Sequence, residues 1–204
     1  MLFRSRTVVA KAKAAQMTND AIDRAVKRGS GEAQGDNYES ITYEGYAPGG
    51  VAMMVDTLTD NRNRTGADIR NIFSKLGGAM AEPGAVGWQF SRRGVIYVDG
   101  SVAEDDVMMA ALEAGADDIS RDGSAWKVLT DPSNVYDVKA ALEAAKIAVS
   151  SAESTMVSST TIEVTDAETA RKILRVMEAL EDNDDVQDVY ANFDISDELM
   201  EAVG

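Results

Sequence analysis

The 204-residue sequence contains no cysteine and no histidine. The absence of cysteine excludes a disulfide framework, a thiolate nucleophile and a thiolate zinc site. The absence of histidine excludes imidazole metal ligation, a Ser-His-Asp triad and the usual proton shuttle near neutral pH. We therefore expect neither an ordinary hydrolase nor a zinc enzyme, and we predict no catalytic centre, no bound metal and no cofactor.

Long apolar runs are missing as well. No window approaches the 18 or so uninterrupted apolar residues of a membrane-spanning helix. The first six residues lack the apolar core and the cleavage site of a secretory signal. With 45% hydrophobic and 27% charged residues, the composition is that of a folded globular protein. We expect a cytoplasmic protein that contacts no membrane.

Charge is distributed unevenly along the chain, whose formal net charge is −15. Residues 1–31 contain seven basic and two acidic residues, and residues 60–93 contain six basic and three acidic residues. Residues 94–204 contain seven basic and 25 acidic residues. Such asymmetry predicts a part that faces nucleic acid, joined to an acidic body that repels phosphate elsewhere. A solvated helix face on an acidic, soluble surface is the alternative.

Hydrophobic periodicity predicts a helical start followed by two compact α+β units. Two short helices, at residues 7–16 and from an N-cap at Thr18 to Gly29, are expected before a polar, Gly-rich linker. A further helix is expected from an N-cap at Thr65 to Gly77, and another begins after a cap at Asp166. The remaining predicted elements are helices at 103–114 and 134–146, and strands at 40–44, 51–58, 85–90, 94–98, 125–130, 148–157, 160–164 and 186–190.

The segment Asp60–Thr65 is the most informative for chemistry. It places Arg62 and Arg64 beside the start of an amphipathic helix, where free backbone N–H groups already favour an anion. Arginine can bind phosphate through two hydrogen bonds, and an asparagine such as Asn63 can contact a base edge or cap the helix. Pairing of both arginines with local acids, with the asparagines forming the turn, is the alternative.

Three other segments resemble binding motifs. Residues 29–35 have the wrong glycine spacing for a dinucleotide loop and follow a helix, so a linker is expected. Residues 118–123 imitate half of a calcium loop, but Leu129 stands where the bidentate carboxylate belongs, so a turn is expected. Residues 181–185 contain four carboxylates, for which we expect a solvated helix end; a weak metal or partner contact is the alternative.

Several long motifs resemble the YebC/PmpR family. They are MTNDAIDRAVKRG (17–29), YEGYAPGG (43–50), DNRNRT (60–65), FSKLGG (73–78), ALEAGADDI (111–119), ALEAA (141–145) and DAETARKILRVMEALEDNDDVQDVY (166–190). The resemblance implies an α+β fold with a helical N-terminal domain (1–36), a central α/β domain (37–98 plus 158–204) and a third α/β domain (99–157) inserted into the second, each α/β domain of about ferredoxin-like size. Members usually begin with a basic stretch that residues 1–6 do not resemble, so the helical domain is expected to be a remnant.

The family resemblance also implies a function. Members are described as regulators of transcription that bind DNA, and relatives are described as translation factors that act at the ribosome; no enzymatic activity is implied. We therefore expect a non-enzymatic regulator that binds DNA, with ribosomal RNA as the first alternative and a protein-interaction module with an acidic docking surface as the second. No small-molecule substrate is expected. The candidate phosphate contacts are Lys11, Lys13, Arg24, Lys27, Arg28, Arg62, Arg64, Arg70, Arg92 and Arg93, with Asn63 as a base or cap contact.

Overall fold

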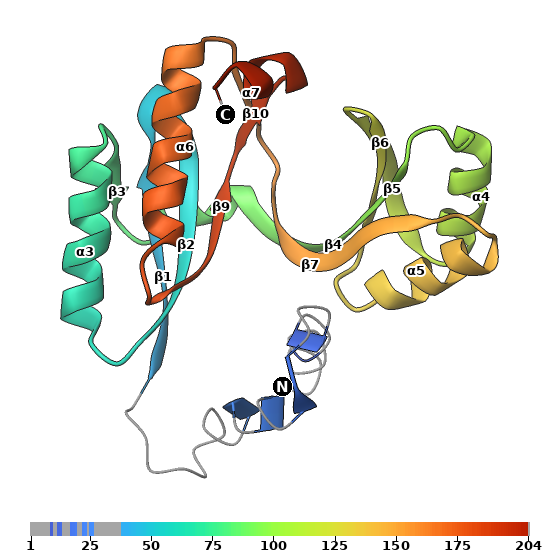
Figure 1. Ribbon diagram of the computed structural model, residues 1–204, viewed down its shortest axis with the longest axis horizontal. Helices are drawn as coiled ribbons and strands as arrows, with labels where there is room; N and C mark the ends of the chain where they lie inside the picture. Colours follow the sequence, from blue (N-terminus) through green and yellow to red (C-terminus); the bar gives the residue numbers. More distant parts are fainter. Residues whose placement is uncertain are drawn as a thin grey trace. The chain divides into compact units, whose positions relative to one another are not determined.

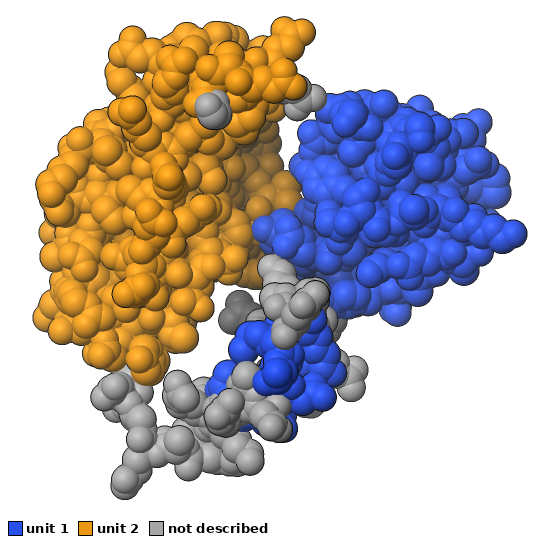
Figure 2. Space-filling model, viewed as in Figure 1, with its two compact units in different colours: residues 1–37, 93–155 blue, residues 38–92, 156–204 orange. Residues whose placement is uncertain are grey.

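The structure is a computed structural model. It describes residues 38–203 and, before them, residues 9, 12, 13, 17–19, 22, 23, 25 and 26. Two compact units are present: one comprises residues 38–92 and 156–204, and the other comprises residues 93–155 with the described residues before 38 (Figure 2). The chain passes from one unit to the other within strands β4 (Phe90–Asp99) and β7 (Val149–Ser158). The predicted domain boundaries at 98/99 and 157/158 also fall in these strands.

Residues 38–92 and 156–204 contain a four-stranded sheet with the order β3-β1-β2-β9. Its strands are β1 (Glu39–Tyr46), β2 (Ala52–Thr59), β3 (Ala79–Ala81) and β9 (Val186–Ala191). β1 is antiparallel to β2 and to β3, and β2 is antiparallel to β9. The turn between β1 and β2 contains the short 3-10 helix η1 (Pro48–Gly50). Gly49 and Gly50 have φ values of 79° and 77°, which explains the glycine pair in this turn.

Helices α3 (Arg62–Lys75) and α6 (Ala167–Glu181) cover one face of this sheet (Figure 1). The N-cap of α6 is Asp166, as predicted, since its side chain accepts a hydrogen bond from the Thr169 amide at 2.8 Å. Strands β8 (Ile162–Val164) and β10 (Phe193–Ile195) pair in parallel, and α7 (Asp197–Val203) follows. The buried core consists of Tyr43, Ala47, Val51, Met53, Val55, Ile69, Phe73, Val164, Ala170, Ile173, Val176 and Leu180.

A second, smaller cluster covers the other face of the sheet. It consists of Ala52, Met54, Val86 and Phe90, with Ala85, Met156 and Tyr190 packed against it. Glu44 holds the loop that supplies Val86, because its carboxylate accepts hydrogen bonds from the amides of Gly84, Val86 and Gly87 at 2.7, 2.6 and 2.8 Å. Burial alone would raise the pKa of Glu44, but these three N–H groups outweigh it and the pKa is lowered. The short 3-10 helix η2 (Gly87–Gln89) then leads into β4.

Residues 93–155 contain a second four-stranded sheet, with the order β5-β6-β4-β7. β5 spans Ala116–Asp122 and β6 spans Ala125–Thr130, and both β4 and β5 are antiparallel to β6. Helices α4 (Glu104–Glu113) and α5 (Val135–Ala144) pack on this sheet. Their common core consists of Ile96, Val98, Val107, Ala111, Val128, Val135, Val138, Leu142 and Ile147. The fold class is α+β, as predicted.

Three local predictions are wrong. The helix predicted to start after an N-cap at Thr65 begins at Arg62, and its cap is Asn61. The strand predicted at 85–90 is absent, because residues 85 and 86 are bends and Gly87–Gln89 form η2. The strand predicted at 94–98 is part of β4, which runs continuously from Phe90 and places Arg92 and Arg93 within the strand. Most of the predicted turn at residues 118–123 belongs to strand β5.

The predicted N-terminal helices are described only in part. Residues 9, 12, 13, 19, 22, 23, 25 and 26 are helical. The Ile22 amide donates to the Thr18 carbonyl at 3.0 Å, the first-turn bond expected of a helix capped at Thr18. Gly29 and the linker at residues 30–37 lie outside the described residues. Within the part that the structure describes, no helix is long and apolar enough to cross a membrane.

Candidate nucleic-acid interface

The start of α3 is fixed by a local cap. The Asn61 side chain accepts a hydrogen bond from the Arg64 amide at 3.1 Å, and the Asn61 amide donates to the Thr59 hydroxyl at 2.9 Å. Asn61 thus satisfies one of the free amides of the first helical turn. Asn63, predicted as a base or cap contact, is not the cap, because it lies in the first turn of the helix and is exposed.

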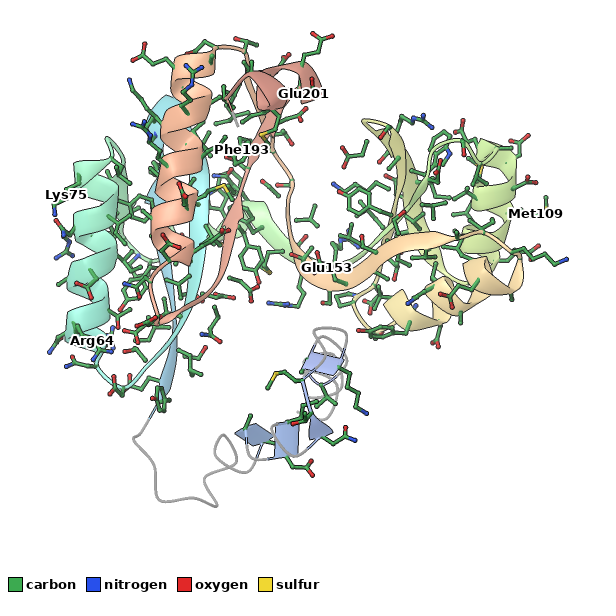
Figure 3. All side chains as sticks on the ribbon, viewed as in Figure 1. Arg64, Lys75, Met109, Glu153, Phe193 and Glu201 are labelled. Atoms are coloured by element: carbon green, nitrogen blue, oxygen red, sulfur yellow. The ribbon has the colours of Figure 1, made fainter. Side chains whose placement is uncertain are left out.

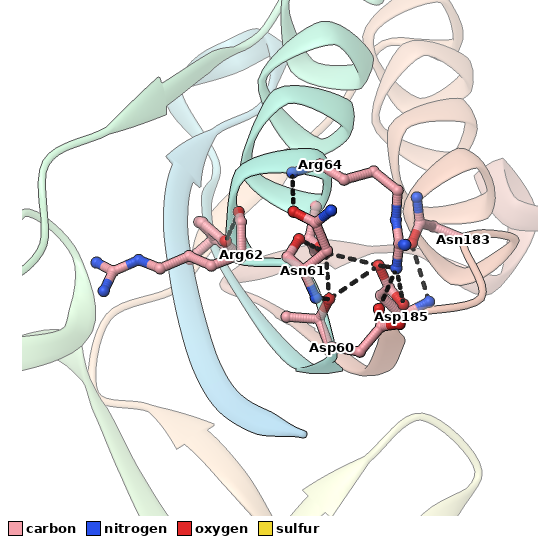
Figure 4. A network of polar contacts seen from close by, with 9 residues as sticks. Asp60, Asn61, Arg62, Arg64, Asn183 and Asp185 are labelled. Carbon is pink, nitrogen blue, oxygen red and sulfur yellow. Dashed lines mark hydrogen bonds and ion pairs between the residues drawn. The ribbon is translucent and has the colours of Figure 1, made fainter. Parts of the chain in front are cut away.

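A carboxylate from a distant part of the chain anchors the same helix end (Figure 4). Asp185, just before β9, accepts hydrogen bonds from the hydroxyls of Thr65 and Thr59 at 2.5 and 3.3 Å. The Asp185 amide in turn donates to the Asn183 side chain at 3.0 Å. Both threonines are fully buried. The hydrogen bond from Thr65, followed by that from Arg64, lowers the pKa of Asp185, so this carboxylate is ionised at neutral pH.

Arg64 is part of this network. Its guanidinium lies 2.9 Å from an oxygen of Asp185 and 2.9 Å from an oxygen of Asp60. Both carboxylates contact the same nitrogen, Nη2, so part of the guanidinium and much of its charge are already engaged within the molecule. For Arg64 the ion pair with Asp60 matches the alternative of local acid pairing, whereas Asp185 is a distant partner. Together they hold the start of α3 against the turn before β9.

Arg62 behaves differently from Arg64, although only two residues separate them. Its side chain extends away from the polar network in Figure 4, and among the described residues no carboxylate lies within ion-pair distance. Arg70, two turns further along α3, is likewise exposed and has no ion pair with any described residue. Arg62, Asn63 and Arg70 are thus the predicted contacts on α3 whose polar groups face solvent.

Arg92 and Arg93 follow one another on β4 but meet different groups. Arg93 forms an ion pair with Asp117 at 3.0 Å. Arg92 is a neighbour of the Tyr190 hydroxyl, whose pKa rises to about 12 because burial, Asp188 and Asp56 together outweigh the lowering effect of Arg92. Arg93 is therefore paired with a carboxylate, which reduces the positive potential that it presents to a phosphate.

The N-terminal candidates can be placed only in part. Lys13 is helical and its side chain is exposed. The other four, Lys11, Arg24, Lys27 and Arg28, lie outside the described residues.

Asp185 is a structural residue that no sequence pattern predicted. The solvated helix end predicted for the carboxylates of residues 181–185 is wrong for Asp185, because the side chain is only 14% exposed and is bonded to α3. No local pattern distinguishes Asp185 from its neighbour Asp184, since the partners lie 120 residues earlier. Among the described residues, no group of three or more acidic side chains is arranged to hold a metal ion.

Comparison with known proteins identifies the family. The family model for the second and third domain of TACO1/YebC matches residues 38–193, which include the whole α3 region. The chain belongs to the TACO1/YebC family. The resemblance noted from the sequence motifs is therefore confirmed.

Relatives of this TACO1/YebC chain carry a common name. A protein of Halothermothrix orenii is 49% identical over 201 residues, covering 97% of this chain and 79% of the relative. A protein of Rubrobacter xylanophilus is 54% identical over 197 residues, covering 96% of this chain and 78% of the relative. Each is named "Probable transcriptional regulatory protein". The names of these relatives indicate a regulatory role for the TACO1/YebC family.

A solved structure supports the TACO1/YebC fold. The crystal structure of the conserved hypothetical protein Aq1575 from Aquifex aeolicus matches with a TM-score of 0.78 and 41% sequence identity. The match covers 94% of this chain and 79% of that one. The α+β architecture is thus shared with a relative.

Proposed function

We propose that this chain is a non-enzymatic regulatory protein that binds DNA, mainly through phosphate contacts. The single observation that carries the proposal is the outer surface of α3. There Arg62 and Arg70 are exposed and have no ion pair with any described residue, whereas Arg64 between them is engaged by two carboxylates. Guanidinium groups without an internal partner at a helix start are suited to phosphate oxygens.

The expected recognition depends little on base sequence. Phosphate contacts position a protein on nucleic acid without reading its sequence. On α3, Asn63 beside Arg62 is the candidate contact for a base edge. The net charge of −15 would keep most other surfaces away from phosphate and so orient the molecule. Exposed Lys13 and the N-terminal cations Lys11, Arg24, Lys27 and Arg28 would add to the basic surface. This function would place the protein in the cytoplasm.

The test replaces the two free arginines of α3. We expect Arg62→Ala with Arg70→Ala to weaken binding to a 30-base-pair duplex about tenfold or more at low salt. The slope of log affinity against log salt should fall by roughly 2, because each lost phosphate contact contributes about 0.9. Fluorescence anisotropy over a salt series measures both quantities.

The matched control removes the same amount of charge elsewhere. Lys139 and Lys172 each lie on an exposed helix face, where each has an ion pair with a glutamate four residues away. Lys139→Ala with Lys172→Ala should reduce affinity much less than the α3 double variant. Equal losses in the two double variants would show that overall charge matters and that α3 is not the contact surface.

A ribosomal RNA target is the second candidate, and the acidic charge of the chain favours it. A surface with a formal charge of −15 is repelled by free duplex, whereas an assembled ribonucleoprotein also presents basic protein surfaces. Duplex binding and ribosome co-sedimentation, each measured across the same salt series, separate the two candidates. A ribosome complex that persists at salt concentrations where duplex binding is lost would favour the ribosome.

A further inference from the structure

Helix α4 exposes three large apolar side chains on one face. Met108, Met109 and Leu112 are 37%, 61% and 47% exposed, while Val107 and Ala111 of the same helix are fully buried. In Figure 3, Met109 lies on the side of α4 that faces away from the sheet. The helix thus has a second apolar stripe, hereafter the α4 stripe (Met108, Met109 and Leu112), in addition to the one that packs into the core.

The spacing makes the α4 stripe continuous. Leu112 lies four residues after Met108 and three after Met109, so the three side chains are neighbours on the helix surface. Clusters of exposed large apolar side chains mark interaction sites more often than single ones do. Methionine is also a common residue of adaptable protein-binding surfaces, because its flexible thioether fits differently shaped partners.

The surroundings of the α4 stripe are acidic. From Asp99 to Asp118 the sequence contains seven acidic residues and no basic one. Three of them, Glu104, Asp105 and Asp106, form the first turn of α4, and Glu113 ends it. On the adjacent helix α5, Lys139 has an ion pair with Glu143 at 3.7 Å. A ligand that covers the apolar side chains would meet carboxylates at both ends of α4.

We infer that the α4 stripe is a docking site for a basic amphipathic helix of another protein. The apolar face of such a helix would cover Met108, Met109 and Leu112, and its lysine or arginine side chains would pair with the flanking carboxylates. Charge complementarity identifies this occupant. A nucleic acid would be repelled by the carboxylates, and a second copy of α4 would oppose like charges to like charges. The site lies on a different helix from the proposed nucleic-acid contacts and does not depend on them.

The test uses a fluorescein-labelled, 18-residue helical peptide of leucine and lysine, with leucine at positions i, i+3, i+4 and i+7. The full-length chain should bind it, and binding should weaken as salt rises because charge pairs contribute. The peptide with glutamate in place of lysine should not bind. Amide signals of α4 should shift in two-dimensional NMR spectra when the basic peptide is added.

Variants then locate the binding site. Met109→Ser should reduce affinity for the basic peptide about fivefold, and the double variant with Leu112→Ser should reduce it further. Met200→Ser is the matched control, because Met200 is 41% exposed on α7 and is flanked by Glu198 and Glu201. This control should bind as the unaltered chain does. All three variants should keep the circular dichroism spectrum of the unaltered chain, since the replaced side chains are exposed.

Four results would overturn the inference. They are failure of the basic peptide to bind, equal binding of the acidic peptide, equal losses in Met109→Ser and Met200→Ser, and a concentration-dependent dimer that Met109→Ser abolishes. The last result would assign the α4 stripe to a second copy of the chain. Duplex binding by Met109→Ser should be unchanged, which distinguishes failure of this inference from failure of the proposed nucleic-acid function.

Discussion

Helices α3 and α4 have similar, buried inner faces but differ in the side chains of their outer faces. Each packs a stripe of buried side chains on a four-stranded sheet: Ile69 and Phe73 from α3, Val107 and Ala111 from α4. The outer face of α3 carries arginines, whereas that of α4 carries methionines, leucine and carboxylates. The inner faces therefore account for folding, and the chemistry of the outer faces indicates different ligands: phosphate for α3 and a basic protein segment for α4.

The largest expected effect is on stability, when a substitution on the inner face of α3 is compared with one on the outer face of α4. Phe73→Ala should destabilise the protein by about 3–5 kcal/mol, because Phe73 is fully buried in the core that α3 forms with the sheet and its removal leaves a cavity. Met109→Ala on the outer face of α4 should change stability by no more than about 0.5 kcal/mol. Urea unfolding followed by circular dichroism measures both values. A loss for Met109→Ala as large as that for Phe73→Ala would show that the α4 stripe serves the core and not a partner.

A smaller effect on stability is expected from the N-termini of the two helices, which are held differently. The start of α3 is tied to Asp185, while the described structure shows no side chain that caps α4. Asp185→Asn should cost about 2 kcal/mol at pH 7, because it weakens charged hydrogen bonds with the buried hydroxyls of Thr65 and Thr59. Unfolding in urea at pH 7 measures this loss.

The effect of Asp185→Asn should depend on pH. The pKa of Asp185 is lowered in the folded state, mainly by the Thr65 hydroxyl and then by Arg64, so its stabilising contribution is fully present above the unfolded value of about 3.9. That contribution is lost as pH falls through the lower folded-state pKa. The stabilities of the variant and the unaltered chain should therefore converge in acid. A difference that stays constant from pH 7 to pH 3 would contradict the assigned role of the ionised carboxylate.

Periodicity predicted the elements whose buried and exposed positions alternate regularly along the sequence. The helix predicted at residues 103–114 is α4 at Glu104–Glu113, the predicted strand at 125–130 is β6, and the Asp166 cap of α6 is present. It failed where distant contacts decide the local structure. Thr65 resembles an N-cap, but its hydroxyl is buried against Thr59 and Asp185, and the helix begins three residues earlier. Similarly, residues 116–122 form β5 because β6 pairs with them, although their composition is typical of a turn.

The sequence predicted which residue types form the candidate site. It did not predict which of the arginines pair with carboxylates. Charge alone grouped Arg62 with Arg64, and only the fold shows that Asp185 engages one of them and leaves the other exposed. The same limitation applies to Arg93, whose partner Asp117 lies 24 residues further along the chain. The exposure of Met109 agrees with helical periodicity, because a residue two positions after the buried Val107 lies on the opposite face of the helix.

The smallest expected effect on stability comes from a substitution that gives α4 a side-chain N-cap like that of α3. Ala103 is the N-cap residue of α4, with φ −61° and ψ 135°, and no side chain accepts a hydrogen bond from the first turn. Ala103→Ser would place an acceptor hydroxyl near the amides of Asp105 and Asp106 and should stabilise the protein by about 0.5–1 kcal/mol in urea unfolding.

The reverse substitution on α3 is the matched control for the α4 cap. Asn61→Ala removes the acceptor of the Arg64 amide and should cost about 1 kcal/mol. A gain at residue 103 together with a loss at residue 61 would show that both helices respond to the same capping interaction. If Asn61→Ala destabilises the protein but Ala103→Ser gains nothing, the three first-turn carboxylates of α4 already satisfy its positive end. In that case these carboxylates stabilise the helix as well as flanking the α4 stripe, and a basic partner would compete with the helix end for them.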